Sequence, residues 1–143
     1  MKGLLTRSLF QRFGWAGDVL PAVIYLCVLL YAGMIPMQSL PAPSFVAADK
    51  FWHLIAFGGL AAMCFRAIHH FKVSVRRASV WAAVAASGFG ALLEVMQAFS
   101  PYRSAELADF VADALGALIA LGIIRVLAKG VAGQPPPGHL SST

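Results

Sequence analysis

Four apolar segments, each long enough to cross a membrane as a helix, follow one another along this chain of 143 residues. Prolines and basic residues separate them, and proline does not continue a helix. The sequence predicts helices at residues 19–35, 50–68, 78–99 and 107–128. We therefore expect an all-α fold, a polytopic membrane protein built as a bundle of four transmembrane helices.

The composition excludes a water-soluble enzyme and a disordered chain. Hydrophobic residues make up 59% of the sequence, charged residues 12%, and the mean hydropathy is +0.76. A soluble domain carries about 25% charged residues, so this chain has too few to cover a globule. The net charge is +5, but the 11 lysines and arginines are too scattered to form a nucleic-acid-binding face, and we expect no nucleic-acid partner.

The basic residues predict the orientation, because cytoplasmic segments retain lysine and arginine. They concentrate in the amino tail, between the second and third helices, and at the carboxyl end. We expect a multi-pass protein of the cell (inner) membrane with both termini cytoplasmic, and with residues 36–49 and 100–106 outside. The basic residues on the cytoplasmic side are Lys2, Arg7, Arg12, Arg66, Lys72, Arg76, Arg77, Arg125 and Lys129.

These features give a domain organisation with one transmembrane unit. Residues 1–18 are expected to be a cytoplasmic amino tail, 19–129 the four-helix domain, and 130–143 a disordered carboxyl tail rich in proline. A cleaved signal peptide is the alternative for the first helix, since Val46-Ala47-Ala48 resembles a cleavage site. The apolar run ends well before that site and is long enough to span, so we interpret it as an uncleaved anchor.

Most acidic residues fall on the predicted outer side. Asp49 and His53 are spaced to share one helix face, as are Glu94 with Gln97 and Asp109 with Asp113. We expect the outer ends of three helices to bring polar side chains into one pocket. The residues predicted to converge there are His53, Glu94, Arg103 and Asp109.

Small residues predict close packing of the helices. The last helix carries a narrow face of small and acidic residues that includes Gly116, and glycines on the two preceding helices offer matching surfaces. Those glycines are Gly58, Gly59, Gly88 and Gly90.

Several polar residues also have purely structural interpretations. Asp49 could be an N-cap, Lys50 an interfacial side chain and Arg103 a loop charge. For Glu94 and Asp113, a structural salt bridge with Arg103, Lys50 or His53 stands beside a binding or chemical role. We expect Asp113 to be neutral or hydrogen-bonded rather than the anion of an inner salt bridge.

Three strings in this order resemble the VanZ-like family. They are Asp49-Lys50-x-x-His53-x-x-Ala56-Phe57-x-x-Leu60-Ala61, then Glu94-x-x-Gln97-x-Phe99-x-Pro101-x-Arg103-Ser104, then Leu107-x-Asp109-x-x-x-Asp113-x-x-Gly116. The resemblance covers residues 49–122 and implies a polar signature of Asp49, Lys50, His53, Glu94, Gln97, Arg103 and Asp109. The family more often has asparagine at position 113. Because its named member is associated with low-level teicoplanin resistance, the resemblance implies a cell-envelope role without defining a reaction.

Two functional hypotheses follow. In the first, the outer pocket binds a lipid-linked envelope precursor or a glycopeptide-like ligand, with membrane lipids as partners, no cofactor and an undefined oligomeric state. The second is an intramembrane enzyme acting on a lipid headgroup or envelope precursor, with His53 as the acid or base and Glu94 and Asp109 as carboxylate partners. The binding residues of the first hypothesis are Asp49, Lys50, His53, Glu94, Gln97, Arg103, Asp109 and Asp113.

Three other chemistries are less well supported by the sequence. A metal site made by Asp49, His53, Glu94 and Asp109 has suitable donors but no diagnostic spacing, so we expect no metal. Neither a glycine elbow nor a Ser-His-Asp order indicates a catalytic triad. Acidic residues at one face do not form a transport path across the membrane.

Overall fold

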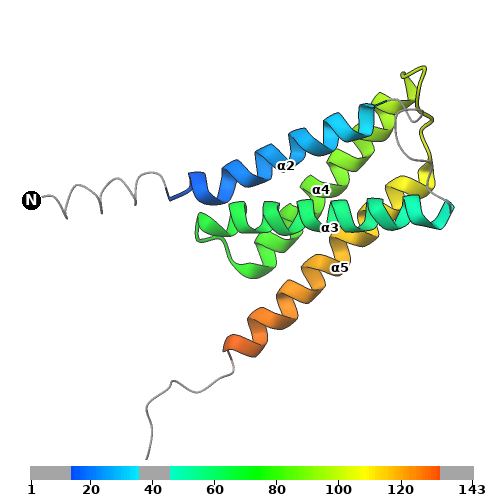
Figure 1. Cartoon of the computed structure of the whole chain (residues 1–143). Coiled ribbons are helices and arrows are strands. Elements are labelled where there is room, and N and C mark those ends of the chain that lie inside the picture. Colours follow the sequence, from blue (N-terminus) through cyan, green and yellow to red (C-terminus); the bar gives the residue numbers. More distant parts are fainter. Residues whose placement is uncertain (1–13, 36–45, 133–143) are drawn as a thin grey trace, which may run out of the picture.

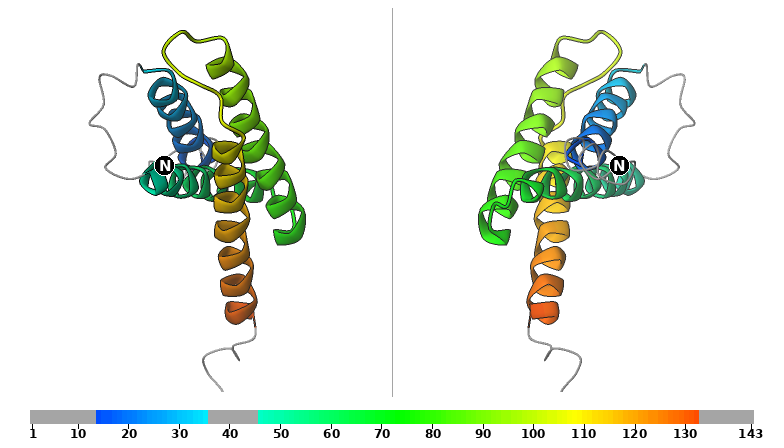
Figure 2. Two further views of the ribbon diagram at one scale, coloured as in Figure 1. Left: turned by 90° about the vertical axis from the view of Figure 1, so that its right-hand side faces the viewer. Right: turned by 90° about the vertical axis from the view of Figure 1, so that its left-hand side faces the viewer.

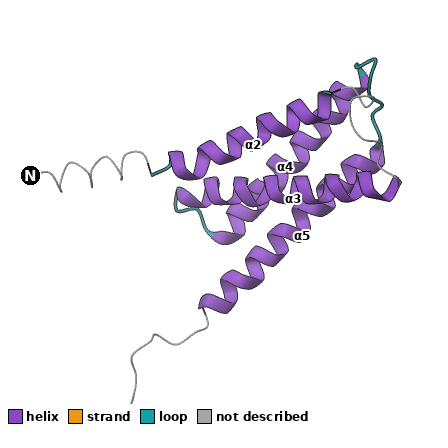
Figure 3. Ribbon diagram, viewed as in Figure 1, coloured by secondary structure: helices purple, strands orange, loops and turns teal. Residues whose placement is uncertain are grey.

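The computed structural model describes residues 14–35 and 46–132, and every regular element within these ranges is an α-helix. The helices are α2 (Ala16–Met34), α3 (Val46–His70), α4 (Val75–Ala98) and α5 (Leu107–Ala132) (Figure 1, Figure 3). All four are long and apolar enough to cross a membrane. The prediction of an all-α fold with four membrane-spanning helices is confirmed.

Each helix extends beyond its predicted range at one end or at both. Because α2 begins at Ala16, Pro21 lies inside it rather than in its first turn. Because α3 begins at Val46, Asp49 lies within its first turn, and its interpretation as an N-cap is wrong. α5 continues to Ala132, past the expected domain boundary at residue 129. Hydropathy marks where the apolar stretch ends, whereas helical hydrogen bonding continues through the polar residues beside it.

The predicted tails fall mostly on residues outside the described part of the chain, which are 1–13, 36–45 and 133–143. The cytoplasmic amino tail and the disordered carboxyl tail therefore stay predictions. The same applies to most of the loop at 36–49.

Successive helices run in opposite directions (Figure 1). The carboxyl ends of α2 and α4 therefore meet the amino ends of α3 and α5 at one end of the bundle, which we call the polar end. α3 is central and packs against the other three helices. α5 diverges from α2 and α3 toward its carboxyl end (Figure 2).

The closest approach of backbones joins α3 to α5. A Cβ atom added at Gly116 would overlap the backbone carbonyl of Leu54, and one at Gly58 would lie 3.1 Å from the carbonyl oxygen of Gly116. The predicted small-residue packing is thus present between α3 and α5. Gly88 differs from the expectation, since it is exposed and has nothing within 4 Å of its Cβ position.

A second polar cluster ties α2 to α3 at the other end of the bundle. Asp18 accepts a hydrogen bond of 2.6 Å from the Arg66 guanidinium, and Nδ1 of His70 lies 2.9 Å from its other oxygen. Between the two ends, the Tyr25 hydroxyl donates to the carbonyl of Ala56 at 3.1 Å. α2 is attached to α3 by polar contacts along its length.

The outer faces of the helices are apolar. Large hydrophobic side chains are about half exposed on all four helices, among them Ile24, Ile55, Val84 and Ile119. Exposed apolar surface on every helix is what a lipid environment requires and what water disfavours. The four helices form a multi-pass membrane protein.

Candidate functional site

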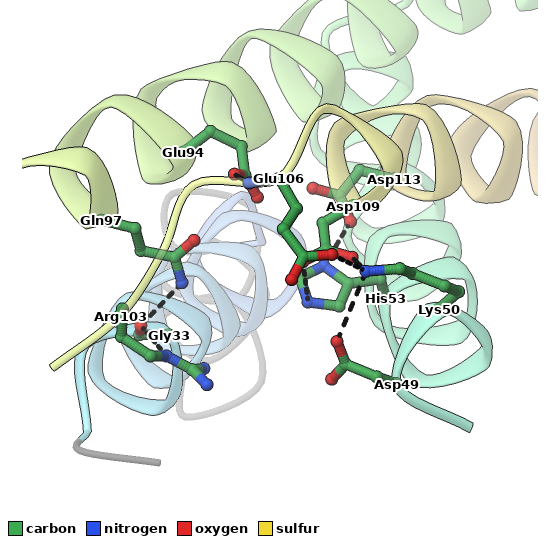
Figure 4. Close-up of polar contacts among 10 residues, drawn as sticks. All are labelled: Gly33, Asp49, Lys50, His53, Glu94, Gln97, Arg103, Glu106, Asp109 and Asp113. Atoms are coloured by element: carbon green, nitrogen blue, oxygen red, sulfur yellow. Dashed lines mark hydrogen bonds and ion pairs between the residues drawn. The ribbon is translucent and has the colours of Figure 1, made fainter. Parts of the chain in front are cut away.

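The polar end contains a pocket built from α3, α4, the following loop and α5 (Figure 4). Six of its seven lining residues come from the three strings, and the seventh, Glu106, stands directly before the third string. The lining residues are Asp49, His53, Gln97, Arg103, Ser104, Glu106 and Asp109.

Lys50 pairs with the acidic side of this pocket. Its ammonium donates to Glu106 Oε2 at 2.6 Å and to Asp109 Oδ1, and it lies 3.7 Å from Asp49 Oδ2. One lysine from the first turn of α3 thereby holds the amino end of α5. Its interpretation as an interfacial side chain alone does not account for these contacts.

Glu106 shows the electrostatic effect of Lys50. The hydrogen bond from Lys50 lowers the pKa of the Glu106 carboxyl, which stands just before α5. A carboxyl whose pKa falls on folding stabilises the fold above its unfolded pKa, and this contribution is lost as the pH drops through the folded value. The contact between Lys50 and Glu106 should therefore weaken under acid conditions.

His53 lies between two aspartates of α5. Its Nδ1 is 2.9 Å from Oδ1 of Asp113, a fully buried residue, and its Nε2 is 3.8 Å from Oδ2 of Asp109. When Asp113 accepts a hydrogen bond from Nδ1–H, Nε2 keeps its lone pair and faces the pocket side. This is the arrangement that fixes an imidazole for proton transfer or ligand binding.

Glu94 supports the wall of the pocket rather than lining it. Its Oε2 accepts a hydrogen bond of 2.7 Å from the backbone N–H of Glu106, while its Oε1 has no partner among the described residues. The residue is 9% exposed. Of the four residues predicted to converge, His53, Arg103 and Asp109 line the pocket, and Glu94 holds the loop that leads into α5.

Gln97 and Arg103 bind the same backbone oxygen of α2. Nε2 of Gln97 donates to the Gly33 carbonyl at 2.8 Å, and Nε of Arg103 donates to it at 3.1 Å. A carbonyl in the last turn of a helix lacks an intrahelical donor, so these side chains satisfy it. Arg103 therefore has a defined position, and its terminal NH₂ groups form no hydrogen bond to the described part of the protein.

Three side chains are close enough to share a cation. Asp49, His53 and Asp109 each offer a donor atom, and these atoms lie within 4.8 Å of one another. The ammonium of Lys50 already contacts Asp109 on this side of the pocket. The Lys50 ammonium thus already provides a positive charge for these donor atoms, and they do not by themselves indicate a metal site.

Sequence reasoning did not place Glu106, Ser104 and Gly33 in the site. Glu106 stands three residues before Asp109, a spacing that could have indicated it. Gly33 contributes only its backbone carbonyl, and no side-chain pattern reveals such a role.

Comparison with protein families matches residues 31–128 to the family described as VanZ/LLP1, which is more than half of the chain. The chain belongs to the VanZ/LLP1 family. The matched region of this VanZ/LLP1 protein runs from the last turn of α2 into α5 and includes every residue of the pocket. Searches among curated proteins and among solved structures gave no match.

Asp113→Asn is expected to leave the stability of the bundle nearly unchanged. An asparagine oxygen accepts the hydrogen bond from His53 Nδ1–H as the carboxylate does, so the change should be about 1 kcal/mol or less. Thermal unfolding in detergent measures it, with Asp113→Ala as the variant that removes the acceptor and leaves a cavity.

A loss of about 3 kcal/mol in Asp113→Asn that is relieved by adding His53→Gln would contradict this expectation. It would show that the native pair is a buried ion pair and that the substitution strands a charged imidazole.

Proposed function

We propose that this VanZ/LLP1 protein is a cell-envelope protein whose pocket faces the outside and binds the phosphate-bearing headgroup of a membrane lipid or lipid-linked precursor. One observation carries the proposal. Arg103 lines the pocket, is held in place through Nε by Gly33, and has terminal NH₂ groups that form no hydrogen bond within residues 14–35 and 46–132 and so can serve a ligand. A guanidinium fixed in this way suits a phosphate, which it can contact through two parallel hydrogen bonds.

The position of the pocket supports a lipid ligand. Its residues come from the amino ends of α3 and α5, the last turn of α4 and the loop between α4 and α5, at the ends of three candidate membrane spans. A lipid headgroup lies at this depth when the acyl chains lie beside the apolar helix surfaces.

The size of the pocket favours a headgroup over a glycopeptide. Its cavity volume is about 30 Å³. This is well below the range for small-molecule pockets, so a ligand can place only a small charged group in it, and an intact glycopeptide antibiotic is far too large to enter. Of the two ligand classes that the sequence suggested, the lipid-linked one fits.

Retention of lipid in native mass spectrometry tests the proposal. The purified chain in detergent is titrated with phosphatidylethanolamine and with phosphatidylglycerol, and Arg103→Gln is compared with Arg77→Gln, an exposed arginine at the other end. We expect Arg103→Gln to weaken lipid binding on the order of tenfold and Arg77→Gln to leave it near the wild-type value. Equal behaviour of the two variants would overturn the proposal.

The proposed orientation places both termini in the cytoplasm. Within the described residues, the polar end has Lys50 and Arg103, whereas the other end has Arg66, Lys72, Arg76, Arg77, Arg125 and Lys129. In a chain whose Cys27 and Cys64 are replaced by alanine, we expect Ser104→Cys to react with an impermeant thiol reagent in intact cells and Ser74→Cys to be protected. The reverse pattern would invert the topology.

Acid–base catalysis is a second candidate, favoured by the contact between His53 and Asp113. Asp113 would position the imidazole, and Nε2 would exchange a proton with a bound headgroup. Incubation of the wild-type chain and of His53→Gln with an envelope lipid extract, followed by mass spectrometry, tests this activity. A product formed equally by both proteins, or by neither, would exclude it.

The proposal also includes a role in teicoplanin resistance, because this resistance is associated with the family. We expect the chain to raise teicoplanin tolerance in a susceptible host through the pocket, and Arg103→Gln at equal expression to abolish the rise. Unchanged tolerance in both strains would separate this protein from the resistance associated with its family.

A further inference from the structure

The residues that line the pocket divide by charge. Arg103 and Gln97 lie on one side, next to the end of α2, while Asp49, Glu106 and Asp109 lie on the other (Figure 4). The loop after α4 contributes to both sides, since Arg103 lies within it and Glu106 is its last residue, while the amino ends of α3 and α5 add Asp49 and Asp109 to the acidic side. A ligand in the pocket meets both charges at once.

The acidic side of the pocket keeps a net negative charge after its carboxylates pair with Lys50. Three carboxylates line it, and a single ammonium, that of Lys50, offsets only one of their charges. Lys50 donates hydrogen bonds to Glu106 and Asp109, whereas Asp49 is 3.7 Å away and its side chain is 33% exposed. The side chain of Glu106 is more exposed, at 51%, but it already accepts a hydrogen bond from Lys50, so Asp49 is the carboxylate left most available to the cation of a ligand.

From this arrangement we infer that the pocket selects a zwitterionic headgroup, a phosphodiester carrying a primary ammonium group, with the phosphate at Arg103 and the ammonium at Asp49. The inference rests on the proposed function and adds the class of ligand. A primary ammonium has three N–H donors for carboxylates, whereas a quaternary ammonium has none. An uncharged glycerol headgroup offers hydroxyl donors without the positive charge.

The chemistry predicts an order of affinity. Phosphatidylethanolamine satisfies both sides of the pocket, and hydrogen bonds between charged partners are about twice as strong as neutral ones. We expect it to bind on the order of tenfold more tightly than phosphatidylglycerol or phosphatidylcholine, the two lipids that keep the phosphate and lack the primary ammonium.

Native mass spectrometry of the full chain, titrated separately with these three lipids, tests the inference. Asp49→Asn should reduce phosphatidylethanolamine binding, so that the ratio of its affinity to that of phosphatidylglycerol falls toward one. Asp18→Asn, which removes an acid at the other end, should preserve the preference. Thermal unfolding of each variant reports whether it is folded.

The outcomes separate the inference from the proposed function. Equal binding of the three lipids by the wild-type chain, still weakened by Arg103→Gln, would overturn the zwitterion inference and leave the headgroup pocket standing. Binding of all three lipids that does not respond to Arg103→Gln would overturn both. Because the wild-type comparison needs no variant, misfolding of Asp49→Asn does not prevent a decision.

Discussion

Gly116→Ala is expected to destabilise the bundle by about 3 kcal/mol, the upper end of the range for overpacking. The added methyl group would overlap the backbone carbonyl of Leu54, and a backbone group cannot move aside as the tip of a side chain can. α3 and α5 would have to separate at their closest point, close to the pocket. Reversible unfolding in mixed detergent measures the loss of stability.

Gly88→Ala is the matched control. Gly88 also lies within a membrane-spanning helix, but it has open space around its Cβ position, so alanine should leave stability unchanged or raise it by up to about 1 kcal/mol through helix propensity. Similar losses of stability in both variants would show that the backbones of α3 and α5 are not in close contact at Gly116.

Lys50→Met is expected to cost roughly 2 to 3 kcal/mol, because it leaves the mostly buried carboxylate of Asp109 without its cation. The apolar stem of the lysine is retained by methionine, so the loss is that of the charge. Glu106 is exposed and should contribute little to the cost. The free energy of unfolding in detergent is again the measured quantity.

Two further variants decide whether the cause is electrostatic. Lys50→Arg keeps the charge and should retain most of the stability. Adding Asp109→Asn to Lys50→Met removes the stranded carboxylate and should recover much of the loss. A double variant less stable than Lys50→Met would mean that the lysine acts through packing instead.

The four helices could be predicted from the sequence because each is a long apolar run bounded by proline or by charge. The residues at which the helices begin and end could be predicted less accurately. α3 begins at Val46, earlier than expected, because the helix continues past the apolar stretch into the turn that holds Asp49. Hydropathy records the preference of a side chain for lipid, and backbone hydrogen bonding does not depend on that preference.

The meeting of polar residues at one end could also be predicted, since charge counting placed three polar helix ends on one side. The residue with which each of these side chains forms its hydrogen bond could not be predicted. Asp113 contacts His53, although Arg103 and Lys50 were equally open as partners, and Arg103 binds a backbone carbonyl instead of an acid. Helical spacing identifies the shared face within one helix, whereas pairing between helices depends on their relative rotation and depth.

Arg103 and Gln97 donate to one acceptor, the Gly33 carbonyl, and this sets the last turn of α2 apart from the rest of the helix. The region matched to the family starts at residue 31 and contains this turn. Only Ala22 and Gly33 are buried in the whole helix. The earlier part of α2 is held to α3 through Asp18 and Tyr25, whereas its final turn is held through Gly33 by the side chains that also border the pocket, so a shift of α2 along its axis would displace Arg103.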